Sequence, residues 1–340
     1  MKPLVSILIP AFDAEQWLAE TLRSAVAETW ENKEIIVVDD GSKDGTLALA
    51  RSFESSIVKV FTHVNQGAAA TRNKAYSLCH GDYIQWLDAD DLLAPEKIAR
   101  QMEAVRDMPS PRTLLSGGWG SFMHRSYHAR FVPSGLWCDL SKAEWLLRKM
   151  EQNAYMQTAS WLMSRELAEA AGPWDTRLLG DDDGEYFCRV LLASDGVRFV
   201  DGAHVYYRQV GPGSLSYIGA SDRKRDAQWT SMELHMSYLL SLEDSQRARA
   251  ACVTFMQNWM VSFYPERLDI FEKAKQLSTE LGGQLEPPRW SWKYSWIQAL
   301  FGWRFARRAQ FELQAFRWSL MSRWDRLLYS FEQSKFTAAN

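Results

Sequence analysis

Three carboxylates lie within four residues at Asp88, Asp90 and Asp91, directly after the apolar run 83–87. The apolar run predicts a buried strand, so the acids gather at its carboxyl end. Acids at this spacing repel one another, and a divalent cation with oxygen ligands would relieve the repulsion. Mg²⁺ or Mn²⁺ could join such carboxylates to the phosphates of a nucleotide. The alternative is a solvated turn in which Asp91 caps the next helix, and for the three acids alone that is the better interpretation.

The elements that must position these acids alternate between strand and helix. Four apolar segments predict strands, each followed by a helix, at residues 4–9, 34–38, 58–61 and 83–87. Alternation with short connections predicts a parallel, doubly wound α/β sheet, whose ligands bind at the carboxyl ends of the strands. Segments 10–15, 39–46 and 88–91 should therefore meet at one edge, which Arg72 could also reach.

Two common nucleotide motifs are missing from the sequence. No GxGxxG follows the first expected strand, and no GxxxxGK[ST] occurs anywhere. The sequence therefore lacks the main evidence for a dinucleotide dehydrogenase or a P-loop NTPase.

Composition further narrows the kinds of protein that this chain can be. The chain has 340 residues, 46% of them hydrophobic, with a net charge of -3. It can bury a large core, and its charge argues against general nucleic-acid binding. The four cysteines form no CxxC pair, as suits a reducing cytosol. We expect a cytoplasmic protein. A signal peptide is not expected because the N-terminus enters a strand within a few residues, and a membrane span is not expected because no apolar run reaches the roughly 18 residues that it needs.

The pattern changes after about residue 111. Strands are expected at 113–116 and 158–163, with a paired set at 197–200 and 204–208. Helices are expected at 141–150, at 164–171 and from the acidic segment 180–185 through Leu192. Because no new nucleotide motif occurs here, this half is predicted to hold the second substrate and a catalytic acid or base.

The last third is predicted to be helical, with two helices in 227–264 and another in 266–281. From Trp290 onward the sequence is aromatic and basic, and one helical stripe holds Phe316, Leu320, Trp324, Leu327 and Phe331. Two interpretations stay open. In the first, the stripe docks on the main domain. In the second, residues 290–331 make peripheral contact with a membrane, because Trp and Arg suit anionic headgroups. Such a surface could also mediate a homodimer.

Four segments together carry a family resemblance. Each segment lies beside the end of an expected strand. In chain order the segments are Pro10–Glu15, Val38–Thr46, Asn65–Asn73 and Asp88–Asp91. With these segments, about the first 215 residues resemble a family 2 glycosyltransferase of GT-A fold. The resemblance implies a Rossmann-like, mostly parallel sheet flanked by helices. It implies a nucleotide-sugar-binding half at 1–110 and an acceptor-binding, catalytic half at 111–219, with a helical region at 220–340 beyond it.

The resemblance also implies a donor, a nucleotide-sugar that is most often a UDP-sugar. Asp40 would accept a hydrogen bond from the uracil N–H with Asp39 close by, and Arg72 would contact a uracil carbonyl. The nucleoside pocket would be lined by Pro10, Phe12 and Glu15.

A metal cofactor, Mn²⁺ or Mg²⁺, follows from the same resemblance. Asp88 would lie by the ribose or the metal, and Asp90 would ligate the metal on the diphosphate. Many members carry a metal-binding His shortly after a Tyr-Arg pair, but here Val210 follows Tyr207-Arg208-Gln209. Ser214 and Ser216 are poor replacements for an imidazole, so the third protein ligand stays unassigned.

The implied chemistry is one direct displacement that inverts the anomeric centre. A carboxylate must take the proton of the acceptor hydroxyl, and a metal would stabilise the departing diphosphate. In the family this base begins a helix a few residues before an Arg. Asp183 is the expected base here, and Asp182 the second choice, ahead of Arg189. The alternative is that these acids only stabilise the helix N-terminus.

The predicted function is therefore an inverting glycosyltransferase. It would move a sugar to a hydroxyl of a saccharide or glycolipid acceptor, in cell-surface polysaccharide synthesis at the cytoplasmic membrane face. A sugar-1-phosphate nucleotidyltransferase would need a Gly-rich, basic loop after the first strand, which 10–15 is not. A catalytically inactive nucleotide-sugar-binding protein or membrane scaffold remains the alternative.

Overall fold

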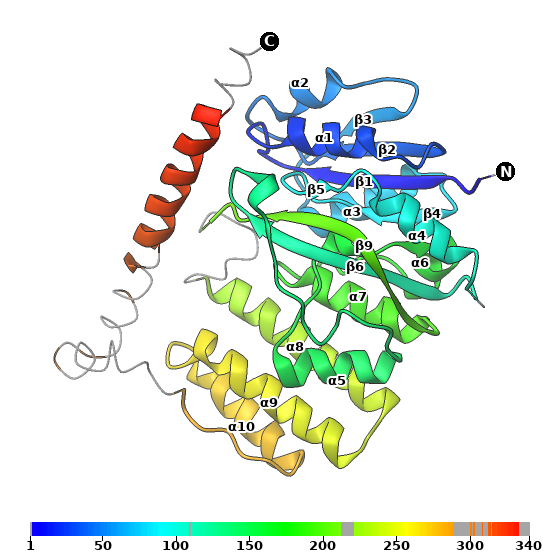
Figure 1. The fold of residues 1–340 in the computed structure, drawn as a ribbon. Coiled ribbons are helices and arrows are strands. Elements are labelled where there is room, and N and C mark those ends of the chain that lie inside the picture. The colour runs from blue at the N-terminus through cyan, green and yellow to red at the C-terminus, as the bar shows by residue number, and fades with distance from the viewer. Residues whose placement is uncertain are drawn as a thin grey trace.

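Two β-sheets form the centre of the molecule (Figure 1). The computed structural model describes residues 2–108, 110–211, 221–288, 300, 302, 308, 312–313 and 315–332. The first sheet has the order β3-β2-β1-β4-β8. Its strands are β1 (Val5–Ala11), β2 (Lys33–Asp39), β3 (Val58–Thr62), β4 (Tyr83–Trp86) and β8 (Met163–Ser164). The first four run parallel and β8 antiparallel, so the predicted α/β sheet is confirmed.

Helices follow each of the parallel strands as predicted. They are α1 (Leu18–Ala27), α2 (Thr46–Arg51), α3 (Ala68–Leu78) and α4 (Lys97–Val105). α1 begins later than the predicted start at residue 13 or 14. Asp13 has a positive φ of 44°, and the backbone N–H of Ala14 donates to Thr46 Oγ1 at 2.7 Å instead of entering a helix.

The second sheet corrects two predictions. Its order is β5-β9-β6-β7, with β5 (Leu92–Leu93), β6 (Thr113–Phe122), β7 (Arg130–Phe131) and β9 (Gly196–Arg208). The predicted pair of strands in 197–208 is wrong, because Asp201-Gly202 makes no turn and β9 continues along β6. A Cβ on Gly117 would meet the Ala203 carbonyl oxygen at 2.0 Å, so this approach requires glycine. Of the predicted strand at 158–163, only Met163 belongs to a strand, β8, because Thr158–Ser160 is a 3₁₀ turn.

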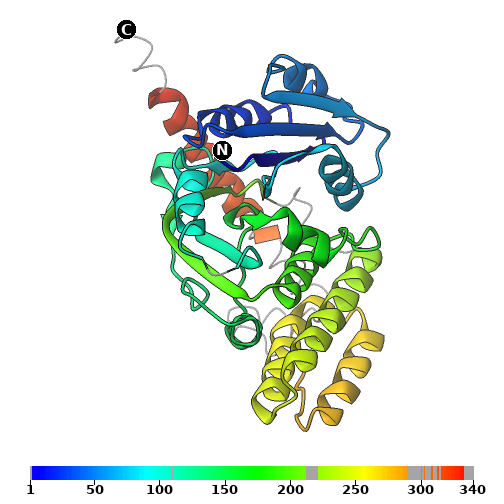
Figure 2. The same cartoon turned by 90° about the vertical axis from the view of Figure 1, so that its right-hand side faces the viewer.

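Six further helices complete the described elements up to residue 288. They are α5 (Lys142–Gln152), α6 (Arg165–Ala171), α7 (Asp182–Ala193), α8 (Asp222–Leu242), α9 (Gln246–Phe263) and α10 (Leu268–Glu280). The helices expected at 141–150 and 164–171 are confirmed, and each has an N-cap, since Ser141 Oγ accepts from Glu144 N and Ser164 Oγ from Leu167 N. In Figures 1 and 2, α8 to α10 form a helical layer at the end of the molecule opposite the first sheet.

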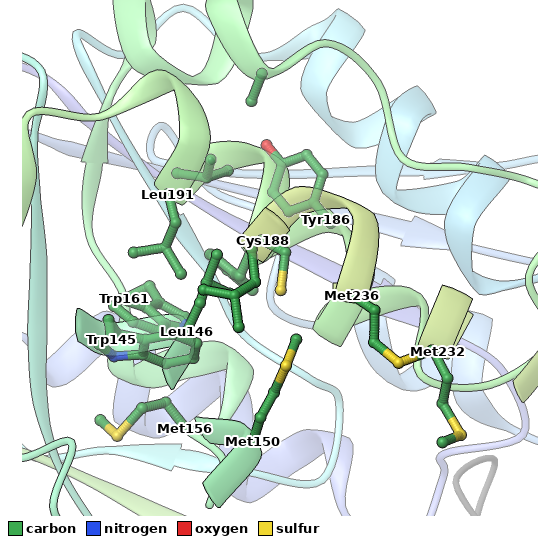
Figure 3. Packing of buried hydrophobic residues seen from close by; sticks show 14 of the residues in the cluster. Trp145, Leu146, Met150, Met156, Trp161, Tyr186, Cys188, Leu191, Met232 and Met236 are labelled. Atoms are coloured by element: carbon green, nitrogen blue, oxygen red, sulfur yellow. The ribbon is translucent and has the colours of Figure 1, made fainter. Parts of the chain in front are cut away.

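A sulfur-rich core fixes α7 between its neighbours. Figure 3 shows Met150 of α5, Cys188 of α7 and Met236 of α8 directed into one cluster, and all three are at most 2% exposed. Trp161 stacks on Phe187 of α7, with ring centroids 5.3 Å apart. Burial of such side chains is worth about 1.5–3 kcal/mol each, so the N-terminus of α7 is held from several sides.

A helix at residues 315–332 lies beside the main body, drawn in red in Figure 1. Asp325 accepts hydrogen bonds from His124 N and Arg125 Nε at 2.9 and 2.8 Å, and Glu332 pairs with Arg125 at 3.0 Å. The interpretation that the apolar stripe docks on the domain is wrong, because the polar face makes these contacts. Of the helices in the described ranges, none has both the length and the apolar character to cross a membrane.

Candidate active site

Three loops meet at one edge of the first sheet, as the strand order predicts. Ala11 of β1 lies opposite Asp39 of β2, and Leu8 lies opposite Trp86 of β4. The backbone N–H of Asp40 donates to the Ala11 carbonyl at 2.8 Å. The segments 10–15, 39–46 and 88–91 therefore lie together at the carboxyl ends of parallel strands, where α/β sheets bind ligands.

Hydrogen bonds join the loop after β1 to the loop after β2. Lys43 N donates to Asp13 Oδ1 at 2.8 Å, and Gly45 N donates to Glu15 Oε2 at 2.9 Å. Glu15 thus has a structural partner, while Phe12 is 46% exposed and Pro10 is half-buried. Of the three residues predicted to line the nucleoside pocket, Phe12 offers the most free surface.

The carboxylates of Asp39 and Asp40 are buried and hold neighbouring loops. Asp40 accepts from Gln66 N at 2.7 Å and from Gly67 N at 2.9 Å. Asp39 accepts from Thr62 Oγ1 at 2.8 Å. Each carboxylate oxygen can accept a second hydrogen bond, so the predicted contact with a base N–H stays a prediction.

Arg72 connects the two sides of this edge. Its Nη2 donates to Asp88 Oδ1 at 2.8 Å, and its Nη1 donates to Asp182 Oδ2 at 2.7 Å. The guanidinium carbon lies 4.4 Å from the Trp174 ring centroid, and Nε is buried without a hydrogen-bond partner among the described residues. Burial works to lower the pKa of Arg72, but the carboxylates of Asp182 and Asp88 outweigh it and raise that pKa. Both terminal nitrogens are thus occupied, and the predicted contact with uracil stays a prediction.

The acidic segment after β4 is held by Arg208. Arg208 N donates to Asp91 Oδ1 and Arg208 Nε to the Asp90 carbonyl, both at 2.8 Å. Burial and the Asp88 carboxylate raise the pKa of Asp90 to about 6. Burial raises the pKa of Asp91 well above its usual value, and the charges of Asp90 and Asp88 add to that rise. Asp91 is fully buried, whereas Asp88 and Asp90 are half-buried.

Asp182 and Asp183 begin α7 but differ in surroundings. Asp182 is 5% exposed and paired with Arg72, and burial raises its pKa to about 6 although Arg72 opposes the rise. Asp183 is half-buried and accepts from Thr158 Oγ1 at 3.2 Å. Arg189 pairs with Glu185 at 2.6 Å. Asp183 is therefore the more accessible carboxylate of the two.

Asp88 and Asp90 are the residues predicted to hold a divalent metal. Two half-buried carboxylates at one sheet edge give the oxygen donors that Mg²⁺ and Mn²⁺ prefer. Burial and, after it, the Asp88 charge raise the pKa of Asp90, and a cation would oppose both effects. Within the described ranges, no group of three or more His, Cys, Asp or Glu side chains could hold a metal ion. Ser214 and Ser216 lie outside the described residues. The residues present fit a metal that takes its remaining ligands from diphosphate and water.

Sequence reasoning missed the residues that hold these acids. Gln157 Nε2 donates to Asp91 and Thr158 to Asp183, while Trp174 packs on Arg72. Glu20 of α1 pairs with Arg208 at 2.6 Å. The 3₁₀ turn that carries Thr158 resembles a strand in sequence. Of these residues, only Trp174 lies near a recognisable sequence signal, the helix breaker Gly172-Pro173.

Comparison with known proteins gives consistent matches. Residues 6–169 match the family model described as Glycosyl transferase family 2. An uncharacterized glycosyltransferase of Rickettsia felis is 34% identical over 247 residues, which cover 72% of this chain and 40% of the relative. TuaG of Bacillus subtilis, a putative teichuronic acid biosynthesis glycosyltransferase, is 36% identical over 109 residues, covering 31% of this chain and 43% of TuaG. The chain thus spans less than half the length of these curated relatives.

A solved structure shares the fold. It is the crystal structure of S. aureus TarS 1-349 in complex with UDP-GlcNAc, with a TM-score of 0.65 and 17% sequence identity. The match covers 82% of this chain and 81% of that chain. It therefore extends beyond residue 169 into the part of the chain that carries Asp182 and Asp183.

Proposed function

Because the chain belongs to glycosyl transferase family 2, we propose that it transfers a sugar from a nucleotide-sugar donor to an acceptor hydroxyl. One observation carries the proposal: Arg72 joins Asp88, beside the acidic segment after β4, to Asp182 at the start of α7. Asp88 on the donor side and Asp182, the neighbour of the more accessible Asp183, thus lie on the two sides of one arginine. This division supports a donor-binding half at 1–110 and an acceptor-binding, catalytic half at 111–219.

A UDP-sugar is the proposed donor. The fold neighbour TarS was crystallised with UDP-GlcNAc, which supports this class of donor without identifying the sugar. In this proposal Asp40 and Asp39 frame the base, with Arg72 at the pocket wall beside them. Phe12 supplies an exposed ring next to the loop after β2, and Pro10 and Glu15 shape that loop.

Asp88 and Asp90 are the proposed ligands of a Mn²⁺ or Mg²⁺ ion on the donor diphosphate. The bound ion would stabilise negative charge on the departing nucleoside diphosphate. Arg208 fixes the backbone of Asp90 and the carboxylate of Asp91, so the segment keeps its shape. Asp91 is too deeply buried to reach a ligand and supports the loop instead.

Asp183 is the proposed general base. The acceptor oxygen would attack the anomeric carbon as the bond to the diphosphate oxygen breaks, and the hydroxyl proton would pass to an Asp183 carboxylate oxygen. One such displacement inverts the anomeric centre. Asp182 is less suited to this role because Arg72 occupies its carboxylate. Thr158 orients Asp183 by donating to Oδ2.

A saccharide or glycolipid is the proposed acceptor, and cell-surface polysaccharide synthesis at the cytoplasmic membrane face is the proposed setting. The similarity to TuaG, a putative teichuronic acid biosynthesis glycosyltransferase, supports this setting.

A thermal-shift panel tests the donor site. UDP, GDP, CDP and TDP would each be added to the full chain with and without Mn²⁺, because a ligand that binds only the native state raises Tm. We expect the largest rise with UDP and Mn²⁺, and Asp90→Asn should remove the metal-dependent part. Glu96→Gln, an exposed change on the loop before α4, is the matched control and should keep the full response. Stabilisation by another nucleotide would refute the UDP assignment, and no response to any nucleotide would contradict the transferase proposal.

A further inference from the structure

In the part of the chain that the structure describes, the helix at 315–332 contacts the main body through its polar face. Asp325 and Glu332 contact Arg125, and Tyr329 donates to Glu20 Oε1 at 3.2 Å. Glu20 also pairs with Arg208, the residue that holds the acidic segment after β4. The helix thus has a defined orientation, and its docked face lies on the part of the molecule that carries the candidate site.

The opposite face is apolar and open. The side chains at one helical spacing are all at least half exposed: Phe316 60%, Leu320 51%, Trp324 65%, Leu327 64% and Phe331 65%. Single exposed apolar residues are ordinary, but a contiguous row over four turns marks an interaction surface. Figures 1 and 2 show this helix standing clear of the rest of the described molecule on its outer side.

The charges beside this stripe are positive. Arg317 and Arg323 are exposed on its two flanks, and Arg326 is exposed next to Leu327. The two acids of the helix, Asp325 and Glu332, are instead turned to Arg125. Residues 290–332 contain seven Lys and Arg against three Asp and Glu, although the whole chain has a net charge of -3. Within 315–332 the exposed charges beside the stripe are therefore cations, while Glu312 is an exposed acid that precedes Phe316 by one turn.

We propose that this stripe, Phe316, Leu320, Trp324, Leu327 and Phe331, seats in the interface of an anionic lipid bilayer. An amphipathic helix lying in the membrane plane buries its apolar face at the boundary between headgroups and acyl chains, and flanking arginines attract anionic lipid. A second copy of the chain packed on this stripe would add the same arginines to the contact, so two positively charged faces would meet. Because the docked face reaches Glu20 and Arg208, binding would hold the candidate site beside the bilayer.

Vesicle co-sedimentation of the full chain tests the proposal without any donor, so its outcome is separate from that of the transferase proposal. Vesicles of 30% phosphatidylglycerol in phosphatidylcholine would be compared with pure phosphatidylcholine. We expect at least tenfold stronger binding to the anionic vesicles, weakened by added salt. Trp324→Ser with Leu327→Ser should lower binding at least tenfold, and Arg317→Gln with Arg323→Gln should lower it about fivefold per arginine on anionic vesicles only.

A matched pair of changes controls for surface hydrophobicity. Val261 of α9 and Leu268 of α10 are also exposed, at 47% and 53%, so Val261→Ser with Leu268→Ser should bind vesicles as wild-type protein does. Equal melting temperatures would show that all three double variants fold. Wild-type protein that fails to sediment with anionic vesicles would overturn the proposal, as would undiminished binding of the Trp324 and Leu327 variant. A dimer in sedimentation velocity that this variant dissociates, without vesicle binding, would assign the stripe to a second copy.

Discussion

Asp182 and Asp183 are adjacent in sequence, yet their surroundings give them different chemistry. The carboxylate of Asp182 is buried and accepts a hydrogen bond from Arg72. The carboxylate of Asp183 is accessible and accepts a hydrogen bond from Thr158. The sequence, with three consecutive aspartates, could not separate them. The structure supports Asp183 because a general base needs a free lone pair within reach of the acceptor.

Thr158→Val tests the orientation of the base. The change removes the hydroxyl that donates to Asp183 Oδ2 but keeps the volume of the side chain. Turnover should fall about tenfold, because the hydrogen bond is worth about 1.5 kcal/mol to a charged acceptor, while KM for the donor stays near the wild-type value. Steady-state kinetics measure both constants. Thr279→Val, an exposed change on α10, should leave both unchanged; a rise in donor KM alone in the Thr158 variant would refute this role.

Arg72→Met tests the bridge between the two halves. It leaves the buried Asp182 carboxylate without its cation, and breaking a buried pair in this way costs about 3–5 kcal/mol. Urea denaturation should show this loss in the free energy of unfolding. Arg177→Met removes an arginine that is 78% exposed from its pair with Asp175 and should cost less than about 1 kcal/mol. Equal losses in the two variants would contradict a buried, structural ion pair at Arg72.

At the scale of elements, the position of Asp183 depends on how α7 begins. Asp181 has a positive φ of 55° and accepts hydrogen bonds from Ser231 Oγ at 2.6 Å and Gln228 Nε2 at 3.2 Å. Both donors lie on α8, outside the residues that match the family model. α8 therefore helps to fix the loop that presents the proposed base.

Ser231→Ala should loosen the start of α7. The buried Ser231 hydroxyl is lost, so stability should fall by about 1–2 kcal/mol and turnover should fall with it. Ser237→Ala, on the exposed face of the same helix, should change neither quantity. Chemical denaturation and turnover assays on both variants measure the effects. Full activity with unchanged stability in the Ser231 variant would show that α8 does not position the base.

Local sequence patterns predicted the repeating elements well but not their long-range contacts. The four parallel strands and the caps at Ser141 and Ser164 follow from short apolar runs and local side-chain hydrogen bonds. β9 was misjudged because Asp201-Gly202 favours a turn locally, while the pairing with β6 keeps the strand continuous. Thr158 was missed because its partner lies 25 residues away, with no local pattern that joins the two.

At the scale of the whole molecule, buried ionisable groups tie the sheets and helices together. Glu28, at the end of α1, accepts from Ile98 N of α4 at 3.2 Å. Lys97 Nζ donates to Gln85 of β4 and to the Trp161 carbonyl. Burial raises the pKa of Glu28 to about 8, with Lys97 opposing the rise, and burial lowers the pKa of Lys97 to about 7. The stability of the fold should therefore depend on pH.

Glu28→Gln should gain stability relative to wild type as pH rises. A carboxyl with a raised folded pKa contributes stability that is complete below its unfolded pKa near 4.5 and is lost as pH rises through about 8. The Lys97 contribution runs the opposite way and begins above pH 7. Because the Glu28 charge also acts on the pKa of Lys97, most of the expected difference should develop between pH 5 and pH 7. Between pH 5 and pH 8 the difference in unfolding free energy should move by roughly 2–4 kcal/mol in favour of the variant. Urea titrations at both pH values measure it, with Glu103→Gln on α4 as the exposed control; a constant difference would contradict a protonated Glu28.

The most direct measurement is UDP release from UDP-GlcNAc, UDP-glucose and UDP-galactose by wild type, Asp183→Asn and Asp182→Asn, with donor affinity measured by calorimetry. For at least one of these donors, Asp183→Asn should lower turnover at least about 100-fold while the Kd stays within about twofold, because the base acts in the transition state. Asp182→Asn should disturb stability as well, because it removes the charge that faces Arg72. Full turnover in the Asp183 variant, or wild-type protein that binds none of the three donors, would contradict the proposed transferase site.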